Sequence, residues 1–286
     1  MEAERAGGPL LGAVVGVVQT SDSTVFVLDQ KWQKIVGFRP DGSYARVILG
    51  GAGDGPGEFR VPVHMALSPT GLLAVLDFDL SRVTFFDAMT GAIKSQVALQ
   101  VVNPLRLLFA GDRIWIGKGV PPGSTGSPAI AFDQAGKRVD AFPEVSDDDR
   151  AYGSSVSLAA DRQGTVLHAS RRPGLWEVKT PSGLEQRESA LFPRLKPPEL
   201  VREDGYLTIG SMEAETGGIA YLGPDRVLLR YRTQKLKTRP PFPDPATVRQ
   251  FFGVFDEAGK FQGTIELPAG RAMDGNRIYV SPLNGT

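Results

Sequence analysis

The side chains that most often bind metal ions or transfer protons are scarce in this sequence. Its 286 residues include two histidines, His64 and His168, and no cysteine. A zinc site built from three histidines or from thiolates is therefore impossible. No G-x-S-x-G segment is present, so a serine nucleophile at a strand-to-helix turn has no signal here. We predict no catalytic residues, no metal site and no cofactor.

Three other segments resemble ligand-binding motifs but lack essential parts of them. The glycine-rich stretch 50–57 is not followed by Lys-Ser/Thr or by a helix, so it cannot form a phosphate-binding loop. The acidic run 147–149 lacks the alternating ligands and the glycine of a calcium loop, and we interpret it as a solvated turn. The basic residues Lys235, Lys237 and Arg239 precede two prolines, and we interpret them as a solvated loop.

Charge and composition exclude further classes. Lys plus Arg and Asp plus Glu both number 32, so the formal net charge is zero and a whole-chain basic field for nucleic acid is absent. The 34 glycines and 22 prolines exceed ordinary usage and are typical of many short strands joined by turns. The apolar run 10–18 contains two glycines and is too short to span a bilayer. We predict no nucleic-acid partner and no membrane insertion.

Strands at a regular period must position the remaining candidate residues. Six short apolar segments share one pattern, and their starts are 48, 41, 52, 61 and 51 residues apart. They are rich in β-branched and aromatic residues and are bounded by turn residues, as strands require. The six segments are 25–29, 73–77, 114–118, 166–170, 227–231 and 278–282.

A second apolar strand, ending in a turn with glycine, follows each of the first five segments. Two further strands complete each unit, which gives four antiparallel strands in about 45–50 residues, the period of a propeller blade. A blade has two apolar faces, and only its neighbours can bury them. The sequence therefore predicts an all-β fold, a six-bladed β-propeller of four-stranded antiparallel blades. The second strands are 35–42, 83–91, 129–136, 175–183 and 251–259.

Residues 50–91 resemble an NHL repeat. The matching features are, in order, the glycine-rich loop, Gly57-x-Phe59-x-x-Pro62, an apolar strand, Gly71, a strand ending in Asp77, Arg82-Val83 and Phe86-Asp87. The resemblance implies a six-bladed propeller of the NHL or TolB-like type with a central channel. Such families include protein-binding scaffolds, lactonase-like and lyase-like enzymes and secreted bacterial propellers, so the fold does not choose the function.

The sixth unit is incomplete in this sequence. It offers only two strands, about 271–273 and 277–280, and the segment before Leu10 is too short to supply two more. We expect an incomplete last blade and a chain that is a fragment or a clipped gene model. We also expect one propeller domain over residues 10–286 and a disordered tail over residues 1–9. From the pattern of its first residues we expect no signal peptide in this chain, although the resemblance implies a periplasmic or extracellular location.

Loop lengths indicate which face of the propeller is the working face. The long loops all connect a blade's fourth strand to the next blade or its second strand to its third, whereas the opposite turns are short. Such asymmetry on a rigid scaffold favours the long-loop face as the site of function. The long loops are 50–62, 118–128, 143–154, 192–217 and 232–250.

Seven residues are our candidates for ligand binding at the channel mouth and on the loop face. For most of them a structural alternative stays open: a polar wall of the channel, a solvated loop or a cover over the blade tops. The candidates are His64, Arg106, Arg171, Arg172, Trp32, Arg82 and Tyr231.

Three further residues have structural interpretations. His168 occupies the core position at the middle of its segment, where Val75 lies in blade 2, and we interpret it as a packed histidine. Asp29 and Asp77 end strands and are interpreted as loop caps.

A binding or scaffolding propeller is the function that these patterns favour. We expect a monomer that recognises a protein, peptide or glycan on the long-loop face, where aromatic and arginine side chains suit an interface. The alternative is a lactonase-like or other propeller hydrolase with a metal in the central channel. The channel strands offer His64, Arg106, Ser155, Gly218 and Arg271, and the lack of a carboxylate among them disfavours this enzyme.

Overall fold

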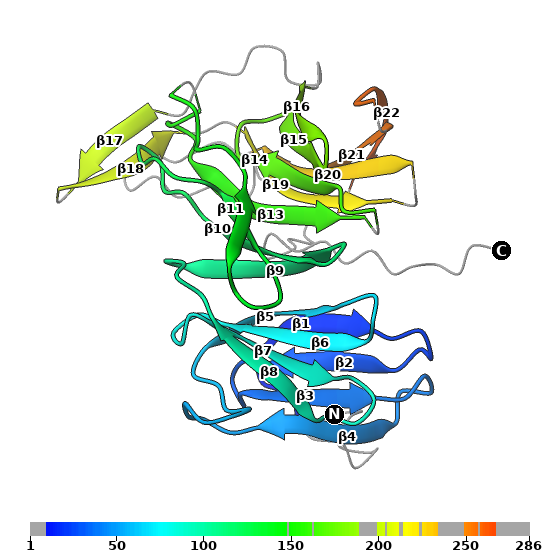
Figure 1. Ribbon diagram of the computed structural model, residues 1–286. Coiled ribbons are helices and arrows are strands. Elements are labelled where there is room, and N and C mark those ends of the chain that lie inside the picture. The colour runs from blue at the N-terminus through cyan, green and yellow to red at the C-terminus, as the bar shows by residue number, and fades with distance from the viewer. Residues whose placement is uncertain are drawn as a thin grey trace. The chain divides into compact units, whose positions relative to one another are not determined.

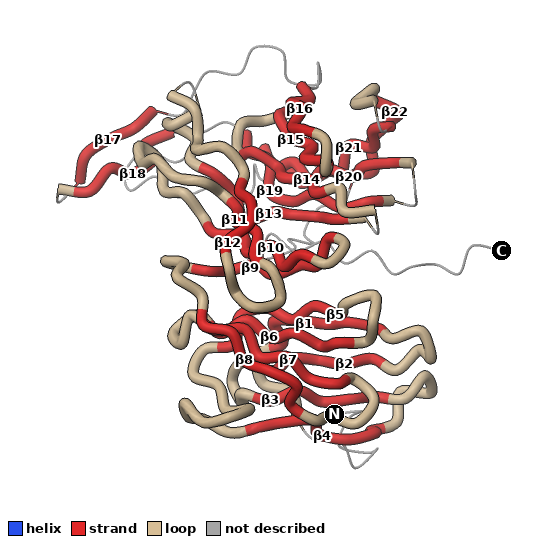
Figure 2. Tube along the Cα trace, viewed as in Figure 1, coloured by secondary structure: helices blue, strands red, loops and turns tan. Residues whose placement is uncertain are grey.

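The computed structural model describes residues 10–266, apart from positions 148, 162, 189–198, 204, 212–213, 223–224, 234–248 and 257. Every regular element in this part is a β-strand (Figure 2). The strands form five four-stranded sheets and one two-stranded sheet. In each four-stranded sheet every strand pairs with the next one along the chain, which is the antiparallel meander of a propeller blade. The fold is therefore all-β and built from propeller blades, as the sequence predicts.

The chain divides into two compact units. Unit 1 comprises Met1–Ile116 and Ala131–Asp140, and unit 2 comprises Gly117–Ile130 and Ala141–Thr286. The expected tail 1–9 and the expected strands of the sixth unit, 271–280, lie outside the described residues. Within the described ranges no helix is long and apolar enough to cross a membrane.

Unit 1 holds the first three blades, apart from residues 117–130 and Ala141 of blade 3. Blade 1 consists of β1 (Val14–Gln19), β2 (Val25–Asp29), β3 (Lys34–Phe38) and β4 (Tyr44–Gly50). Blade 2 consists of β5 (Pro62–Leu67), β6 (Leu72–Asp77), β7 (Arg82–Asp87) and β8 (Ile93–Ala98). Blade 3 consists of β9 (Pro104–Ala110), β10 (Arg113–Lys118), β11 (Ala129–Phe132) and β12 (Arg138–Ala141). The first strands β1, β5 and β9 lie side by side (Figure 1).

Unit 2 holds two more blades. Blade 4 consists of β13 (Ser154–Ala160), β14 (Val166–Ser170), β15 (Leu175–Thr180) and β16 (Gly183–Glu188). Blade 5 consists of β19 (Ala214–Tyr221), β20 (Arg226–Thr233), β21 (Arg249–Asp256) and β22 (Phe261–Glu266). The first strands β13 and β19 lie side by side, as in unit 1 (Figure 1).

A separate hairpin lies between blades 4 and 5 in the chain. Its strands are β17 (Glu199–Glu203) and β18 (Tyr206–Ser211), which pair antiparallel. We expected an uninterrupted loop over residues 192–217, and that expectation is wrong. Gly205 has φ +87°, so it supplies the positive φ of a tight turn between two runs of strand-forming residues.

Facing blades bury each other's apolar side chains. In unit 1, Phe26 and Leu28 of blade 1 pack with Leu73 and Val75 of blade 2. In unit 2, Trp176 of blade 4 packs with residues of blade 5, including Phe255, at a centroid distance of 4.9 Å. Large buried side chains of this kind each contribute roughly 1.5–3 kcal/mol. Because stacking buries both faces of a blade, inner strands such as β2 and β6 are continuous buried runs.

Two aspartates cap equivalent positions in blades 1 and 2. Asp29 accepts hydrogen bonds from the amides of Ala13 at 3.1 Å and Trp32 at 3.2 Å. In blade 2, Asp77 accepts a hydrogen bond from the amide of Arg60 at 2.8 Å. Burial raises the pKa of Asp29, but these backbone donors outweigh it and hold the pKa below its ordinary value. The interpretation of both residues as loop caps is confirmed.

Candidate functional site

Unit 2 carries two long loops that leave blade 3 at the same end. One is 119–128, between β10 and β11, and the other is 142–153, between β12 and β13. The Gly123 amide donates to the Arg150 carbonyl at 2.8 Å, and the Val145 amide donates to the Gly126 carbonyl at 3.1 Å. We call these two hydrogen-bonded segments the blade 3 loop pair.

The close approach within the loop pair depends on Gly153. Its φ is +66°, a region that side chains with a Cβ rarely adopt. A Cβ at this position would also lie 2.4 Å from the carbonyl oxygen of Val120 in the other loop. Any larger residue would therefore push the two loops apart.

A cavity of about 150 Å³ lies between the second loop of the pair and blade 4. Its wall combines apolar and polar side chains, all of them in unit 2. The lining residues are Pro128, Pro143, Glu144, Val145, Ser146, Asp149, Gly153, His168, Ser170, Leu175, Glu177 and Gln186.

A row of polar residues across blade 4 contributes to this lining. Across β14, β15 and β16, His168 pairs with Glu177 and Glu177 pairs with Gln186. His168 Nδ1 lies 2.8 Å from Glu177 Oε2, and Gln186 donates to Glu177 Oε1 at 3.5 Å. His168 is only 2% exposed, and its ring packs against Phe142. Burial raises the pKa of Glu177, but the bond to His168 and its charge outweigh burial, so that pKa lies below its ordinary value.

The same row is apolar in blade 1 and only partly polar in blade 2. The positions of His168 and Glu177 are occupied by Val27 and Val36 in blade 1. They are occupied by Val75 and Thr84 in blade 2. Buried polar pairs are weak evidence for stability, because apolar residues of similar volume often stabilise as much or more. A polar pair in an apolar position beside a cavity therefore marks blade 4 as the candidate site.

Asp149 lines the same cavity and has a separate set of polar partners. Ser146 Oγ donates to Asp149 Oδ2 at 2.9 Å. The guanidinium of Arg172 lies 3.5 Å from Asp149 and 2.7 Å from Glu188. The interpretation of the acidic run 147–149 as solvated is therefore wrong for Asp149, which is buried under its partners.

The structure brings two of the predicted ligand-binding residues together near this cavity. Arg172 lies in the β14–β15 turn and reaches Asp149 of the second loop. Arg171 precedes it in that turn, and its carbonyl accepts a hydrogen bond from the Thr216 amide at 3.2 Å. Arg172 thus belongs to the candidate site, whereas the backbone of Arg171 joins the turn to blade 5.

Two other predicted residues lie on the long-loop end of unit 1. Arg82 donates to the carbonyls of Asp54 at 2.9 Å and Glu58 at 2.7 Å, so it holds the glycine-rich loop. Trp32 is 47% exposed, and the ammonium groups of Lys31 and Lys34 lie 5.2 and 5.8 Å from its ring centroid. Arg82 is therefore a structural clamp, and Trp32 is an exposed aromatic surface.

The remaining predicted residues are less accessible. His64 in β5 is 7% exposed and Arg106 in β9 is half-buried, and both lie on first strands as predicted. Tyr231 is fully buried in the unit 2 core, where its ring stacks on Phe251 at a centroid distance of 5.4 Å. A surface ligand cannot reach the Tyr231 ring in this packing.

The residue pattern predicts that His168 is a packed core residue, and it does not identify Glu177 as a site residue. The interpretation of His168 as packed agrees with its burial, but its partner is a carboxylate. A signal was present, because two strands joined by a four-residue turn, with Ser170 opposite Leu175, place position 168 opposite position 177. The sequence signal for the buried pair therefore lies in the register between the two strands and not in either strand alone.

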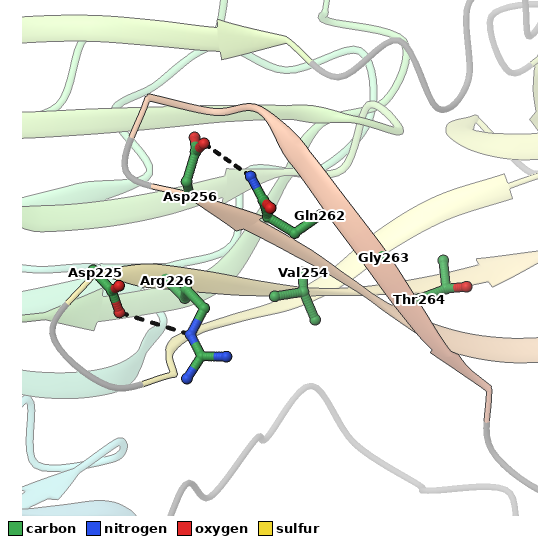
Figure 3. Close-up of a pocket in the computed structure, with 7 residues that line it drawn as sticks. All are labelled: Asp225, Arg226, Val254, Asp256, Gln262, Gly263 and Thr264. Carbon is green, nitrogen blue, oxygen red and sulfur yellow. Dashed lines mark hydrogen bonds and ion pairs between the residues drawn. The ribbon is translucent and has the colours of Figure 1, made fainter.

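A larger pocket lies on blade 5, with a volume of about 410 Å³ (Figure 3). Asp256 and Gln262 are hydrogen-bonded at 2.9 Å, and Arg226 lies 3.7 Å from Asp225. Both members of the second pair are more than half exposed. We rank this pocket below the blade 4 cavity because its polar groups are solvated and already paired with each other.

Metal-ligating residues are dispersed in the part of the chain that the structure describes. No group of three or more His, Asp or Glu side chains there is placed to hold a metal ion. His168 and Glu177, at the blade 4 cavity, are bonded to each other.

The family comparison agrees with the blade architecture. The model of a protein family described as a 6-bladed beta-propeller matches residues 10–112, which span β1–β9. No curated protein matches the sequence.

Solved structures show the same fold at low sequence identity. A DUF4221 family member from Bacteroides vulgatus has a TM-score of 0.63 at 10% identity, covering 91% of this chain and 82% of its own. A Bacteroides fragilis protein that its name describes as exported has a TM-score of 0.58 at 12% identity, covering 91% and 72%. A streptogramin B lyase has a TM-score of 0.54 at 12% identity, covering 89% and 69%. At such identities the likeness establishes the β-propeller fold alone.

Proposed function

We propose that this chain is a non-catalytic binding or scaffolding propeller that recognises a protein, peptide or glycan through its long-loop face. In this proposal the blade 3 loop pair and the cavity beneath it form the recognition site. The observation that carries the proposal is the buried His168–Glu177 pair next to loops that are hydrogen-bonded to each other. Loops that are ordered in advance lose little conformational freedom on binding, which favours affinity.

The size of the cavity supports a macromolecular ligand. Its volume of about 150 Å³ is below the range that encloses a drug-sized molecule. It suits one side chain or one edge of a sugar ring, and the rest of such a ligand would lie on the loop pair. This division between one buried anchor and a wider surface is common at protein interfaces.

The chemistry of the lining indicates which group enters. Glu144, Asp149 and Glu177 all line the cavity, and His168 is the one lining residue that can be cationic. Carboxylate, amide and hydroxyl oxygens accept hydrogen bonds. We therefore propose that the entering group is a donor: an ammonium, a guanidinium or a sugar hydroxyl.

A binding screen with the full chain tests the proposal. The purified protein is exposed to a peptide library and to a glycan array, and the best ligand is titrated by calorimetry. Glu144 is exposed at the rim, and Glu144→Lys should weaken that ligand about tenfold or more, because it places a cation against a donor. Glu199→Lys makes the same charge change on an exposed strand outside the cavity and should leave affinity unchanged.

Two results would contradict this assignment. One is the lack of any specific ligand in both libraries. The other is a ligand whose affinity is equal in the wild type, Glu144→Lys and Glu199→Lys, because such a ligand binds elsewhere.

A propeller hydrolase is the second candidate function, and one observation favours it. Glu177 holds His168 Nδ1 at 2.8 Å beside a cavity, an arrangement that can orient an imidazole as a general base. Assays with lactone and ester substrates would establish an enzyme if turnover were lost in His168→Asn. Equal turnover rates in the wild type and His168→Asn would contradict this candidate function.

We also propose that the propeller is of the NHL type and works outside the cytoplasm. The first part is supported by the NHL-like features of residues 50–91, and the second by the structural likeness to the Bacteroides fragilis protein named as exported. Fractionation of the native host, with detection of the natural gene product, tests the location. Recovery from the cytoplasm would contradict it.

A further inference from the structure

A second cavity lies in unit 1, at the seam between blades 2 and 3. Its volume is about 280 Å³, and it opens at the short-turn end of the two blades. The β5–β6, β9–β10 and β11–β12 turns all contribute to it. The lining residues are Ser68, Pro69, Thr70, Leu72, Phe85, Ser95, Phe109, Gly111, Asp112 and Gln134.

Two aromatic rings, one from each blade, form its apolar wall. Phe85 of β7 and Phe109 of β9 have centroids 6.4 Å apart and planes inclined by 55°. Leu72 and Pro69 extend this apolar surface. Tilted aromatic faces of this kind favour a further ring packed edge-on or offset against them.

The seam beside the cavity is tightly packed. Gly136, in the β11–β12 turn, has φ +83°, and a Cβ there would lie 2.3 Å from Val97 Cγ1 of β8. The turn that carries Gln134 therefore lies directly against blade 2. The walls of the cavity come from elements fixed by this contact, which limits the cost of ordering the site on binding.

The rim carries a carboxylate that has no partner among the residues the structure describes. Asp112 is exposed in the β9–β10 turn. The cation next to it in sequence, Arg113, lies 3.0 Å from Asp140, and Lys94 lies 3.2 Å from Asp87. The Asp112 charge is thus available to a ligand.

We propose that this seam cavity binds a small aromatic molecule that carries a cationic amino group. The ring packs against Phe85 and Phe109, and the ammonium group faces Asp112. Ser95 and Gln134 supply further polar groups at the rim. The cavity is close to the lower limit of ordinary ligand sites, so it selects a single ring and excludes larger fused systems.

The test uses three probes on the full chain: phenethylamine, 2-phenylethanol and hexylamine. Saturation-transfer NMR reports contact of the ring, and titration of phenylalanine-labelled protein gives the affinity. Phenethylamine should bind saturably and perturb Phe85 and Phe109. The alcohol should bind about tenfold more weakly, because it lacks the charge-assisted interaction with the carboxylate. Hexylamine should give no saturable binding.

Two variants assign the site. Asp112→Asn should lower the affinity for phenethylamine to that for 2-phenylethanol. Asp79 is an exposed acid on the long-loop end, and Asp79→Asn should leave both affinities unchanged. Phe109→Leu should weaken both ring-bearing probes, and thermal unfolding of each variant checks that it folds. The proposal is overturned if phenethylamine gives no saturable response, or if the wild type and Asp112→Asn bind amine and alcohol equally well.

Discussion

His168 Nδ1 and Glu177 Oε2 lie 2.8 Å apart on neighbouring strands of blade 4, and both side chains are almost fully buried. Neither strand could bury its own polar residue without the other, because an unpaired buried polar group costs about 1–3 kcal/mol. The pair occupies a row that is apolar in blade 1. This relationship links the stability of blade 4 to the chemistry of the cavity beside it.

Replacing Glu177 should therefore destabilise the protein. Glu177→Ala leaves His168 without its acceptor and should cost about 1–3 kcal/mol in the free energy of unfolding. Urea unfolding followed by fluorescence measures the change. Glu185→Ala serves as the control. Glu185 neighbours Gln186 in β16 and is 60% exposed, so its loss should cost less than about 1 kcal/mol in the free energy of unfolding.

The effect of Glu177 on stability should depend on pH in a defined direction. Its folded-state pKa lies below the ordinary value of 4.5, so the unfolded state binds this proton first as pH falls. The stability that Glu177 contributes is then complete well above pH 4.5 and is lost as pH falls through the folded-state pKa. Unfolding free energies of the wild type and Glu177→Gln should differ most near neutral pH and converge in acid. A difference that grows below pH 4.5 would contradict the direction of the shift.

Removing the Arg82 clamp should release the glycine-rich loop. Arg82→Ala deletes the donors to the Asp54 and Glu58 carbonyls, so limited proteolysis and hydrogen exchange should increase over residues 50–59. Arg60→Ala removes only the ion pair with Asp54, whose members are 53% and 58% exposed. This control should change stability by less than about 1 kcal/mol. Equal protection of the loop in wild type and Arg82→Ala would argue against the clamp.

Two glycine variants separate backbone strain from steric overlap. Gly42 and Gly136 have φ values of +79° and +83°, but a Cβ at Gly42 has no atom within 4 Å, whereas one at Gly136 meets Val97. Gly42→Ala should cost about 1–2 kcal/mol, the usual penalty for this backbone region. Gly136→Ala should cost more, because blade 3 must also move away from blade 2. Equal losses of thermal stability in the two variants would show that Val97 and the neighbouring residues of blade 2 shift at little cost.

Metal removal should leave the protein unchanged if it is the binding module that we propose. Thermal unfolding in EDTA, and then with added Ca²⁺ or Zn²⁺, should give one melting temperature. A site specific to the folded state, saturated at about 100 times its Kd, would instead add about 2.7 kcal/mol. A saturable rise in melting temperature would therefore favour a hydrolase with a metal in the central channel.

Local pattern predicts the strands of the blades, although it does not predict the β17–β18 hairpin. The segments 25–29 and 166–170 coincide with β2 and β14, and Asp29 and Asp77 cap strands as expected. The signals for these features lie within a few residues of each other: short apolar runs, turn glycines and a strand-ending aspartate. Each blade is a meander of consecutive strands, so its pairing follows from the order of the chain.

The sequence by itself thus determined the all-β blades and the turns that join them. Only the tertiary structure decided that Arg82 holds a loop, that Tyr231 lies in the core and that Asp149, which lines the same cavity as His168, contacts Arg172. These outcomes depend on contacts between residues more than 20 positions apart, such as Asp149 and Arg172. The packing of one blade against the next sets such distances, and no periodicity within a single strand encodes them.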